Sequence, residues 1–326
     1  MSTLVIKLGI IGYRNHVERL VEVIHKRKDC RIECFYHPTK KLKNLKITNN
    51  FDDLLLCDAI IISSPNHTHC NYIKKLEQNY SGYIFCEKPP ATSTLELKKL
   101  KNLKSKYKSK IFFNFNYRFS NFNKILSKNL KSQKLGKIVL VNIISNHGLS
   151  FKKGYSSSWR ADGKNNLHNI LETVSIHFLD LAISNFGSIV KSHNTSKLIS
   201  NNGSSFDTSY LLLNHKNGVL TTILNSYATP LIEELMIIGT NGYLTIRKNK
   251  LIIHSPRNSF DKKGFFITPP ISSSSNFDLK SDYNSSLKKS MDFFITHVKN
   301  KKTFPITNFR LSLDTNEILL KLEQNH

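Results

Sequence analysis

The sequence predicts an α/β fold in which a doubly wound parallel sheet is followed by a second α/β domain with a large, open, mostly antiparallel sheet. Two observations predict this class. In the first third of the 326 residues, short apolar runs alternate with helical segments, as they do in parallel sheets. The remainder contains β-runs joined by Asn-Gly pairs, which indicate hairpins. We therefore expect domains at 1–118 and 119–326, with packing of the C-terminal helix back on the first domain as an alternative to its place in the second.

The first domain is expected to alternate strands and helices. Apolar runs predict strands at 5–11, 32–36, 59–62, 83–86 and 111–115. A helix is expected over 17–26, where Leu20, Val21 and Ile24 share one face. Ser93 and Glu96 form a capping box that starts a lysine-rich helix.

The second domain is expected to mix helices with hairpins. Helical patterns cover 122–130, 167–185, 286–299 and 309–322. Strands are expected at 138–144, 210–213, 219–224, 235–238, 243–246 and 251–253. The serine-rich segment 271–284 is expected to be a loop.

The formal charge of +25 admits nucleic acid, an anionic membrane or a phosphorylated substrate as partner. The lysines are spread along the chain, and the densest run, 98–110, lies on an amphipathic helix, so we favour solvated helix faces over a nucleic-acid surface. No apolar run approaches the roughly 20 residues that span a bilayer. The five cysteines form no CxxC pair, which favours buried thiols in a reducing cytoplasm.

The stretch 82–90 combines a short apolar strand with an acid, a base and two prolines. Proline ends the strand after Lys88, at the carboxyl edge where open α/β sheets bind ligands. Lys88 is therefore a candidate proton donor. The alternative is a surface turn with a solvated lysine.

The first strand-to-helix turn, 9–17, has the position of a dinucleotide-binding loop but only part of its glycines. Gly12 stands at a matching place, whereas Arg14 and Val17 replace the second and third glycines. Arg14 offers a cation near a phosphate, and Asn15 and His16 complete the turn. A purely structural turn explains this stretch equally well.

The end of the second strand bears on the choice of cofactor. An acid there normally binds the ribose 2′-hydroxyl of NAD, but this chain has Tyr36, His37 and then Pro38 to Lys41. The neutral and cationic residues at the end of this strand favour NADP over NAD. After the strand at 59–62, Ser64, Pro65 and Asn66 precede His69. We assign His69 to shaping the cofactor site. A metal site at this histidine would lack carboxylate or cysteine ligands at a credible spacing.

A second concentration of polar groups lies on the helix at 167–185. Thr173, His177 and Asp180 fall on one stripe, which indicates either a functional face or a satisfied core histidine. Trp159 and Arg160 lie upstream in a loop. A planar cation beside an aromatic ring suits recognition of a sugar or phosphate, and a packed tryptophan is the alternative.

With these residues placed, the chain resembles the Gfo/Idh/MocA family of nicotinamide-dependent oxidoreductases nearly from end to end. The motifs that carry the resemblance occur in the family's order: Asp58-Ala59-Ile60, Pro65-Asn66 with His69, Glu87-Lys88-Pro89, Asn116-Tyr117-Arg118-Phe119, Gly136-Lys137-Ile138, His177-Phe178-Leu179-Asp180 and Ile238-Gly239-Thr240-Asn241-Gly242.

The resemblance implies a Rossmann domain, a substrate domain whose open sheet mediates a homo-dimer or tetramer, and sugars, sugar nucleotides or polyols as substrates, many in polysaccharide assembly. Lys88 would be the general acid/base and His177 would orient or protonate the same oxygen, with Thr173 beside it. The expected cofactor-binding residues are Gly12, Arg14, Asn15, His16, His37, Ser64, Pro65, Asn66, His69, Glu87, Lys88, Pro89 and Asn116. The expected substrate-binding residues are Arg118, Trp159, Arg160, Glu172 and Asp180.

One departure from the family pattern concerns the helix that carries His177. Thr173 stands where the family usually has an acid, four residues before the histidine. Glu172 is adjacent, but one residue is about 100° round an α-helix. Glu172 therefore serves only if the helix is locally irregular. The eroded glycine loop and Thr173 also motivate a rival hypothesis, a non-catalytic cofactor-binding scaffold or sensor of the same fold.

Overall fold

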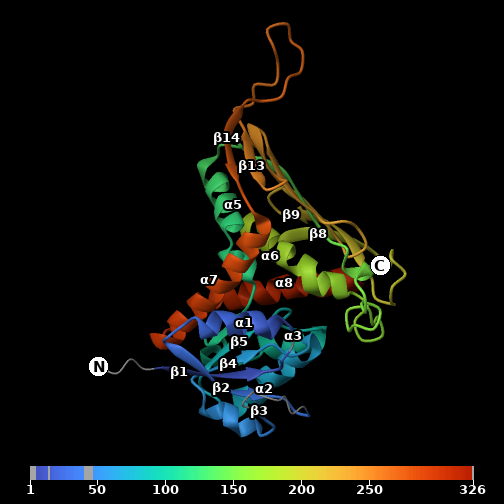
Figure 1. The fold of residues 1–326 in the computed structure, drawn as a ribbon. Helices are drawn as coiled ribbons and strands as arrows, with labels where there is room; N and C mark the ends of the chain where they lie inside the picture. The colour runs from blue at the N-terminus through green and yellow to red at the C-terminus, as the bar shows by residue number, and fades with distance from the viewer. Residues whose placement is uncertain (1–4, 14, 40–46, 325–326) are drawn as a thin grey trace. The chain divides into compact units, whose positions relative to one another are not determined.

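The computed structural model describes residues 5–13, 15–39 and 47–324. The chain divides into two compact units, which are considered separately (Figure 1). The first comprises Met1–Asn116 and Ser285–Leu320, and the second comprises Tyr117–Asn284 and Lys321–His326. Among the described residues, no helix is both long and apolar enough to cross a membrane.

The first unit is built on a six-stranded parallel sheet, as the sequence predicted. Its strand order is β3-β2-β1-β4-β5-β6. The strands are β1 (Ile6–Ile11), β2 (Cys30–Tyr36), β3 (Ile47–Thr48), β4 (Ala59–Ile62), β5 (Tyr83–Cys86) and β6 (Ile111–Phe113). The order reverses between β1 and β4, and ligands of doubly wound sheets bind outside the carboxyl ends of the strands at such a switch point.

Helices cover both faces of this sheet, so its strands are apolar on both sides. The helices are α1 (Asn15–His25), α2 (His69–Asn79), α3 (Thr94–Lys101), α4 (Ser105–Lys108), α7 (Leu279–Lys299) and α8 (Ile306–Gln324). Neighbouring residues of β5 point to opposite faces. The Phe85 ring contacts Phe294 of α7 at a centroid distance of 5.3 Å, whereas the Cys86 thiol faces Cys70 of α2.

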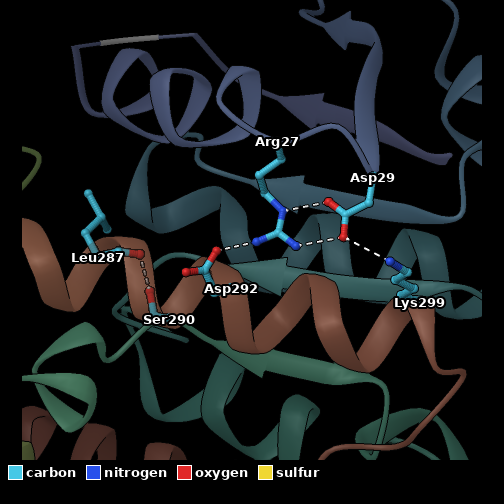
Figure 2. Close-up of polar contacts among 6 residues, drawn as sticks. All are labelled: Arg27, Asp29, Leu287, Ser290, Asp292 and Lys299. Carbon is cyan, nitrogen blue, oxygen red and sulfur yellow. Dashed lines mark hydrogen bonds and ion pairs between the residues drawn. The ribbon is translucent and has the colours of Figure 1, made fainter.

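The late segment 285–320 packs within the first unit. The ring of Phe304, which follows α7, lies 5.5 Å from that of Phe112. Arg27 donates from Nε to Asp29 at 2.9 Å and pairs with Asp292 of α7, while Lys299 reaches Asp29 at 3.5 Å (Figure 2). The predicted boundary at 118/119 places this segment in the second domain, with only the C-terminal helix allowed to pack back on the first. The pattern of an amphipathic helix does not show which surface the helix covers.

The second unit contains an eight-stranded sheet in the order β14-β13-β12-β11-β7-β10-β9-β8. Its strands are β7 (Ile138–Asn146), β8 (Ile189–Lys197), β9 (Thr208–His215), β10 (Leu220–Ser226), β11 (Ile232–Gly239), β12 (Gly242–Arg247), β13 (Lys250–His254) and β14 (Ile271–Asn276). Only β7 and β10 pair in parallel; the remaining pairs are antiparallel. The predicted class of the second domain is confirmed.

One face of this sheet is packed and the other is open. In β9, Leu211 and Leu213 are buried while Tyr210 and Leu212 are exposed, which is the alternation of a half-buried strand. Helices α5 (Asn121–Ser132) and α6 (Ile176–Phe186) belong to this unit.

One prediction for the second unit was wrong in detail, and one strand was not predicted. The expected loop 271–284 contains strand β14, which pairs with β13, and the first residues of α7. Serines suit β14 because it is a solvent-exposed edge strand, where polar side chains discourage further pairing. Strand β8, which the sequence analysis did not identify, carries mostly polar residues.

A hairpin projects between β13 and β14, as Figure 1 shows in orange. An isolated bridge joins Phe260 to Phe266, and the Asp261 carboxylate accepts from the amides of Lys263 and Phe265. Beside this charged turn, Phe260, Phe265 and Phe266 are exposed, Phe266 by 87%.

Candidate active site

The turn after β1 is fixed by a close approach to the loop after β4. Gly12 has φ +92°, and a Cβ there would lie 2.8 Å from Ser64 Cα and 2.9 Å from the Ser63 carbonyl oxygen. Its amide donates to the Tyr36 carbonyl at 3.2 Å. Only glycine fits this cradle at the switch point, so the first turn suits a dinucleotide whose phosphates approach the backbone. Helix α1 begins at Asn15, whereas Arg14 and the side chains of Asn15 and His16 lie outside the described residues.

His69 joins two loops at this edge. Its Nδ1 lies 2.8 Å from the Pro89 carbonyl and its Nε2 2.9 Å from the Ser64 carbonyl, with the ring fully buried. Burial lowers the pKa of His69 and the nearby Lys88 cation lowers it further, while the two carbonyls act in the opposite direction. Both ring nitrogens are engaged with the backbone, so His69 frames the loops and has no nitrogen left for a metal.

Hydroxyl side chains also stabilise the turn after β4. The Thr68 hydroxyl donates to the Pro65 carbonyl at 2.7 Å and lies 2.6 Å from the Ser64 hydroxyl. Asn66 begins a short 3₁₀ turn that leads into α2. The turn after β4 is therefore stabilised by hydroxyl side chains from within the same loop.

The backbone of Lys88 is held on both sides. The Glu87 amide donates to the Ile62 carbonyl at 2.9 Å, and the Glu87 carboxylate accepts from Asn114 Nδ2 at 2.8 Å. The Lys88–Pro89 peptide bond is cis, and the Pro89 carbonyl contacts His69. Lys88 itself is half-buried. A lysine fixed in this way can hold or release a proton at a defined position.

Two further predicted cofactor residues lie in the first unit. The His37 amide donates to the Thr48 carbonyl at 3.3 Å, and His37 Nδ1 accepts from the Thr39 amide at 3.2 Å. Asn116 is buried and donates to Ser286 Oγ at 2.8 Å. Lys40 and Lys41, which contribute to the predicted NADP rim, lie outside the described residues.

In the second unit, a π-helix at Leu171–Ser175 leads into α6. The local irregularity on which a role for Glu172 depends is therefore present. A π turn closes a five-residue spacing, which is the separation of Glu172 from His177. The Glu172 carboxylate, 6% exposed, accepts from Asn166 Nδ2 at 2.8 Å. Burial and the charge of Glu172 raise the pKa of Glu323 to about 9.

Thr173 lies in a chain of hydroxyls. Its Oγ1 donates to the Asn169 carbonyl at 2.6 Å and lies 2.5 Å from the Tyr227 hydroxyl. Because the threonine proton is directed at the carbonyl, the Tyr227 hydroxyl is the donor of the second bond. The His177 ring is packed 5.0 Å from the Tyr117 ring.

Arg118 and Asp180 bind each other. Arg118 Nε donates to Asp180 Oδ2 at 2.8 Å and Nη2 donates to Oδ1 at 2.5 Å. Asp180 is fully buried, so this bidentate pair is shielded from water. The positive charge of Arg118 is therefore paired with the negative charge of Asp180 within the second unit.

Arg160 lies among aromatic rings and hydroxyls. Its guanidinium carbon is 4.7 Å from the Trp159 ring centroid. Burial lowers the pKa of His147 and the Arg160 charge lowers it further. Burial raises the pKa of Tyr227, while the Arg160 charge opposes that rise. We call the set formed by His147, Tyr155, Arg160, Asn169, Thr173 and Tyr227 the Arg160 cluster.

The sequence analysis missed four members of this cluster. The Tyr227 ring stacks on His147 at 5.0 Å and meets Tyr155 at 6.3 Å. Tyr227 follows β10 directly and His147 follows β7, so polar aromatic residues at strand ends were the available signal. Tyr155 and Asn169 had no comparable signal.

The family models match both units of the chain. The model described as "Oxidoreductase family, NAD-binding Rossmann fold" covers residues 6–115, and the Gfo/Idh/MocA C-terminal domain covers 125–245. Together these matches span more than half of the protein. The chain belongs to the Gfo/Idh/MocA family of NAD(P)-binding oxidoreductases.

Solved structures share the fold of this Gfo/Idh/MocA protein over nearly its whole length. An oxidoreductase from Agrobacterium radiobacter, in complex with NAD⁺, L-tartaric acid and magnesium, has a TM-score of 0.78 at 17% identity, covering 98% of this chain and 96% of that one. Myo-inositol 2-dehydrogenase from Lactobacillus plantarum has a TM-score of 0.78 at 18% identity, covering 98% and 97%.

A curated relative is similar over a shorter stretch. Glucose-6-phosphate 3-dehydrogenase of Bacillus subtilis (strain 168) is 27% identical over 140 residues, which is 42% of this chain and 39% of that enzyme. The match therefore spans well under half of that enzyme's length.

Proposed function

We propose that the protein is a dehydrogenase or reductase that transfers a hydride between a nicotinamide cofactor and a hydroxyl or carbonyl group of a sugar or sugar nucleotide, with Lys88 as the general acid/base. The observation that carries this proposal is the fixed backbone of Lys88 at the carboxyl end of β5, held by Ile62 on one side and His69 on the other. Glucose-6-phosphate 3-dehydrogenase and myo-inositol 2-dehydrogenase among the similar proteins support a sugar or polyol substrate.

The cofactor would be held by the turns after β1, β4 and β5. Gly12 permits close approach to phosphate, and the stretch Ser64–Asn66 with His69 forms the facing rim. When bound, the nicotinamide supplies the hydride acceptor or donor. Lys88 takes the proton from the substrate hydroxyl in oxidation and returns it in reduction, and such a positioned group contributes about 10²–10⁴-fold to the rate.

Replacement of Lys88 tests this role. We expect Lys88→Met to lower kcat by at least two orders of magnitude, measured as nicotinamide absorbance with a panel of sugars, and to leave cofactor affinity within about threefold by fluorescence titration. Lys98→Met, which removes an exposed lysine from α3, is the matched control and should not change turnover.

Unchanged turnover in Lys88→Met would remove Lys88 from the reaction. A wild-type protein that binds cofactor but turns over no sugar would instead be the non-catalytic scaffold of the same fold.

For the cofactor we propose a preference for NADP over NAD. The support is the end of β2, where Tyr36 is followed by His37 and no acid. A neutral or cationic rim tolerates a 2′-phosphate. The ratio of KM values for the two cofactors tests this preference, and a tenfold preference for NAD contradicts it.

In the second unit we propose that His177 orients or protonates the substrate oxygen and that Thr173 positions Tyr227. Trp159 and Arg160 contact substrate in this proposal, whereas Arg118, Asp180 and Glu172 act by holding neighbouring groups. The support is that the charged ends of Arg118 and Asp180 bind each other. His177→Ala is expected to lower kcat about 10- to 100-fold with little change in cofactor affinity, measured in the same assays.

We further propose a homo-dimer or tetramer formed through the open face of the second unit's sheet, in the cytoplasm, with a role in sugar-nucleotide or polysaccharide metabolism. Leu212 and Met236 are exposed on that face, and the cross-strand register places Thr222 and Asn142 between them. Sedimentation of a Leu212→Arg/Met236→Arg variant tests the assembly: a monomer is expected.

The cytoplasmic location is supported by the cysteines. The five cysteines are buried free thiols, which suits a reducing compartment.

A further inference from the structure

Arg160 is a cation for which the second unit provides no carboxylate partner. Among the residues that the structure describes, no Asp or Glu lies within ion-pair distance of Arg160, whereas Arg118 is fully engaged by Asp180. The Nε of Arg160 is buried and has no hydrogen-bond partner among the described residues. Its flat face lies over Trp159 and it hydrogen-bonds the Tyr227 hydroxyl, which leaves Nε and the guanidinium N–H groups that Tyr227 does not accept for another group.

The neighbours of Arg160 hold further unused hydrogen-bonding groups. Asn169 is fully buried, and its Nδ2 has no partner within the described part of the chain. The same is true of the Tyr155 hydroxyl and of Ser158 Oγ. Native proteins rarely leave buried polar atoms unpaired, and clusters of such atoms call for a ligand. Most of these groups are donors.

The acids near the cluster are already bound by other groups. Asp207 is close enough to Tyr155 to raise its pKa, but its carboxylate accepts from the amides of Ile199 and Ser200 and from Thr208. Glu172 accepts from Asn166. The pKa of His147 is lowered by burial and by Arg160, so the histidine adds no second cation. The cluster therefore presents one positive charge surrounded by neutral donors.

We propose that the Arg160 cluster binds an anionic substituent of the sugar, a phosphate or a carboxylate, so that the preferred substrates are sugar phosphates or acidic sugars rather than neutral sugars. Guanidinium matches both groups through paired N–H donors, and the hydroxyl and amide donors beside it satisfy the remaining oxygens. This inference rests on the proposed function for the identity of the substrate as a sugar, but the anion site itself is defined by the second unit alone.

Three probes distinguish the chemistry: glucose 6-phosphate, glucuronate and glucose. In the wild type we expect kcat/KM to be about 10- to 100-fold higher for the better of the two anionic sugars than for glucose, because a charge-assisted hydrogen bond is roughly twice as strong as a neutral one. Arg160→Gln should abolish this discrimination through KM, and Arg160→Lys should retain part of it.

Lys153→Gln is the matched control, because it removes one positive charge from an exposed position in the same loop. It should leave the discrimination intact. Circular dichroism melts of each variant separate a lost contact from a lost fold. Equal use of neutral and anionic sugars by the wild type, or an equal loss for both in a folded Arg160→Gln protein, would overturn the proposal.

A binding measurement separates this proposal from the proposed function. If the wild type oxidises or reduces none of the three sugars, thermal-shift titrations with glucose 6-phosphate and with glucuronate still decide the anion site. Stabilisation of the wild type and of Lys153→Gln, but not of Arg160→Gln, supports the site even though the catalytic proposal fails. Equal shifts in all three proteins, or no shift in any, contradict it.

Discussion

Lys88 and Arg160 are held in different ways. At the carboxyl edge of the parallel sheet, main-chain groups on both sides of Lys88 hold it: the Glu87 amide bonds to Ile62, and the Pro89 carbonyl contacts His69. In the Arg160 cluster, side chains hold one another, as Tyr227 does with Thr173. A main-chain frame tolerates changes in most side chains, whereas a side-chain cluster changes with each member. The first arrangement suits a cofactor common to many enzymes, and the second suits a substrate specific to one.

The largest expected effect comes from filling the cradle at Gly12. Gly12→Ala should lower the free energy of unfolding by about 3 kcal/mol, because a Cβ meets the Ser63–Ser64 backbone and because φ is positive. Gly218→Ala is the matched control, with φ +86° and nothing within 4 Å, and should cost about 1 kcal/mol. Urea melts measure the free energy of unfolding of both variants. Equal losses would show that the space beside Gly12 can accommodate a Cβ.

His69→Ala tests the frame around Lys88. It removes the ring between the carbonyls of Ser64 and Pro89, one of which accepts from the neutral imidazole, so we expect a loss of about 1–3 kcal/mol in unfolding free energy together with a fall in kcat. His193→Ala removes an exposed histidine whose Nε2 contacts the Thr195 hydroxyl, and should cost less than about 1 kcal/mol. Retention of full kcat by a destabilised His69→Ala protein would show that Lys88 does not depend on this frame.

The buried acids beside the π-helix give the second region a pH dependence. The folded protein holds the Glu323 proton up to about pH 9, whereas an unperturbed glutamate loses it near 4.5. The fold therefore binds more protons within this window, and its stability falls as pH rises through it. We expect Glu323→Gln to stabilise the protein by about 2 kcal/mol at pH 8 and to have little effect below pH 4.5.

Thermal melts from pH 5 to 9 measure the difference between wild type and Glu323→Gln. Glu18→Gln, an exposed glutamate on α1, serves as the control and should follow the wild type. Parallel pH profiles for all three proteins would mean that Glu323 is ionised in the fold.

The smallest effect is expected from a single hydroxyl of the Arg160 cluster. Tyr227→Phe removes the donor to Thr173 and should cost about 1 kcal/mol in stability while raising KM for the preferred sugar severalfold. Tyr80→Phe removes a buried hydroxyl that donates to the Cys57 carbonyl in the first unit, and should cost as much without changing KM. Equal KM values for both variants would remove Tyr227 from the substrate site.

The same contrast explains which parts of the molecule the sequence could predict. Strands β1, β4 and β5 are apolar runs, and their ends place Gly12, Ser64 and Lys88 at one edge without any knowledge of side-chain contacts. The Arg160 cluster gathers residues from loops and strand ends that are up to 80 positions apart, so local pattern carries no information about it. The π turn at Glu172 likewise has no sequence signal, because it depends on tertiary packing.

The polar strand β14 and the packing of helix α7 on the first unit were not predicted, for related reasons. Strand β14 is serine-rich and owes its conformation to pairing with β13. Helix α7 has an apolar stripe, but only the three-dimensional structure shows that Phe294 meets Phe85.

The return of residues 285–320 to the first unit has a consequence for synthesis on the ribosome. The parallel sheet is complete once Phe113 has been made, yet the face of Phe85 and Phe112 that contacts Phe294 and Phe304 stays uncovered until α7 and Phe304 emerge. At about 5–20 residues per second this interval lasts roughly 10–40 s. During that time the nascent chain exposes a patch of aromatic residues, which makes it a client for chaperones that bind apolar surfaces. A fragment that stops at Asn116 would carry the same exposed face permanently and is expected to aggregate.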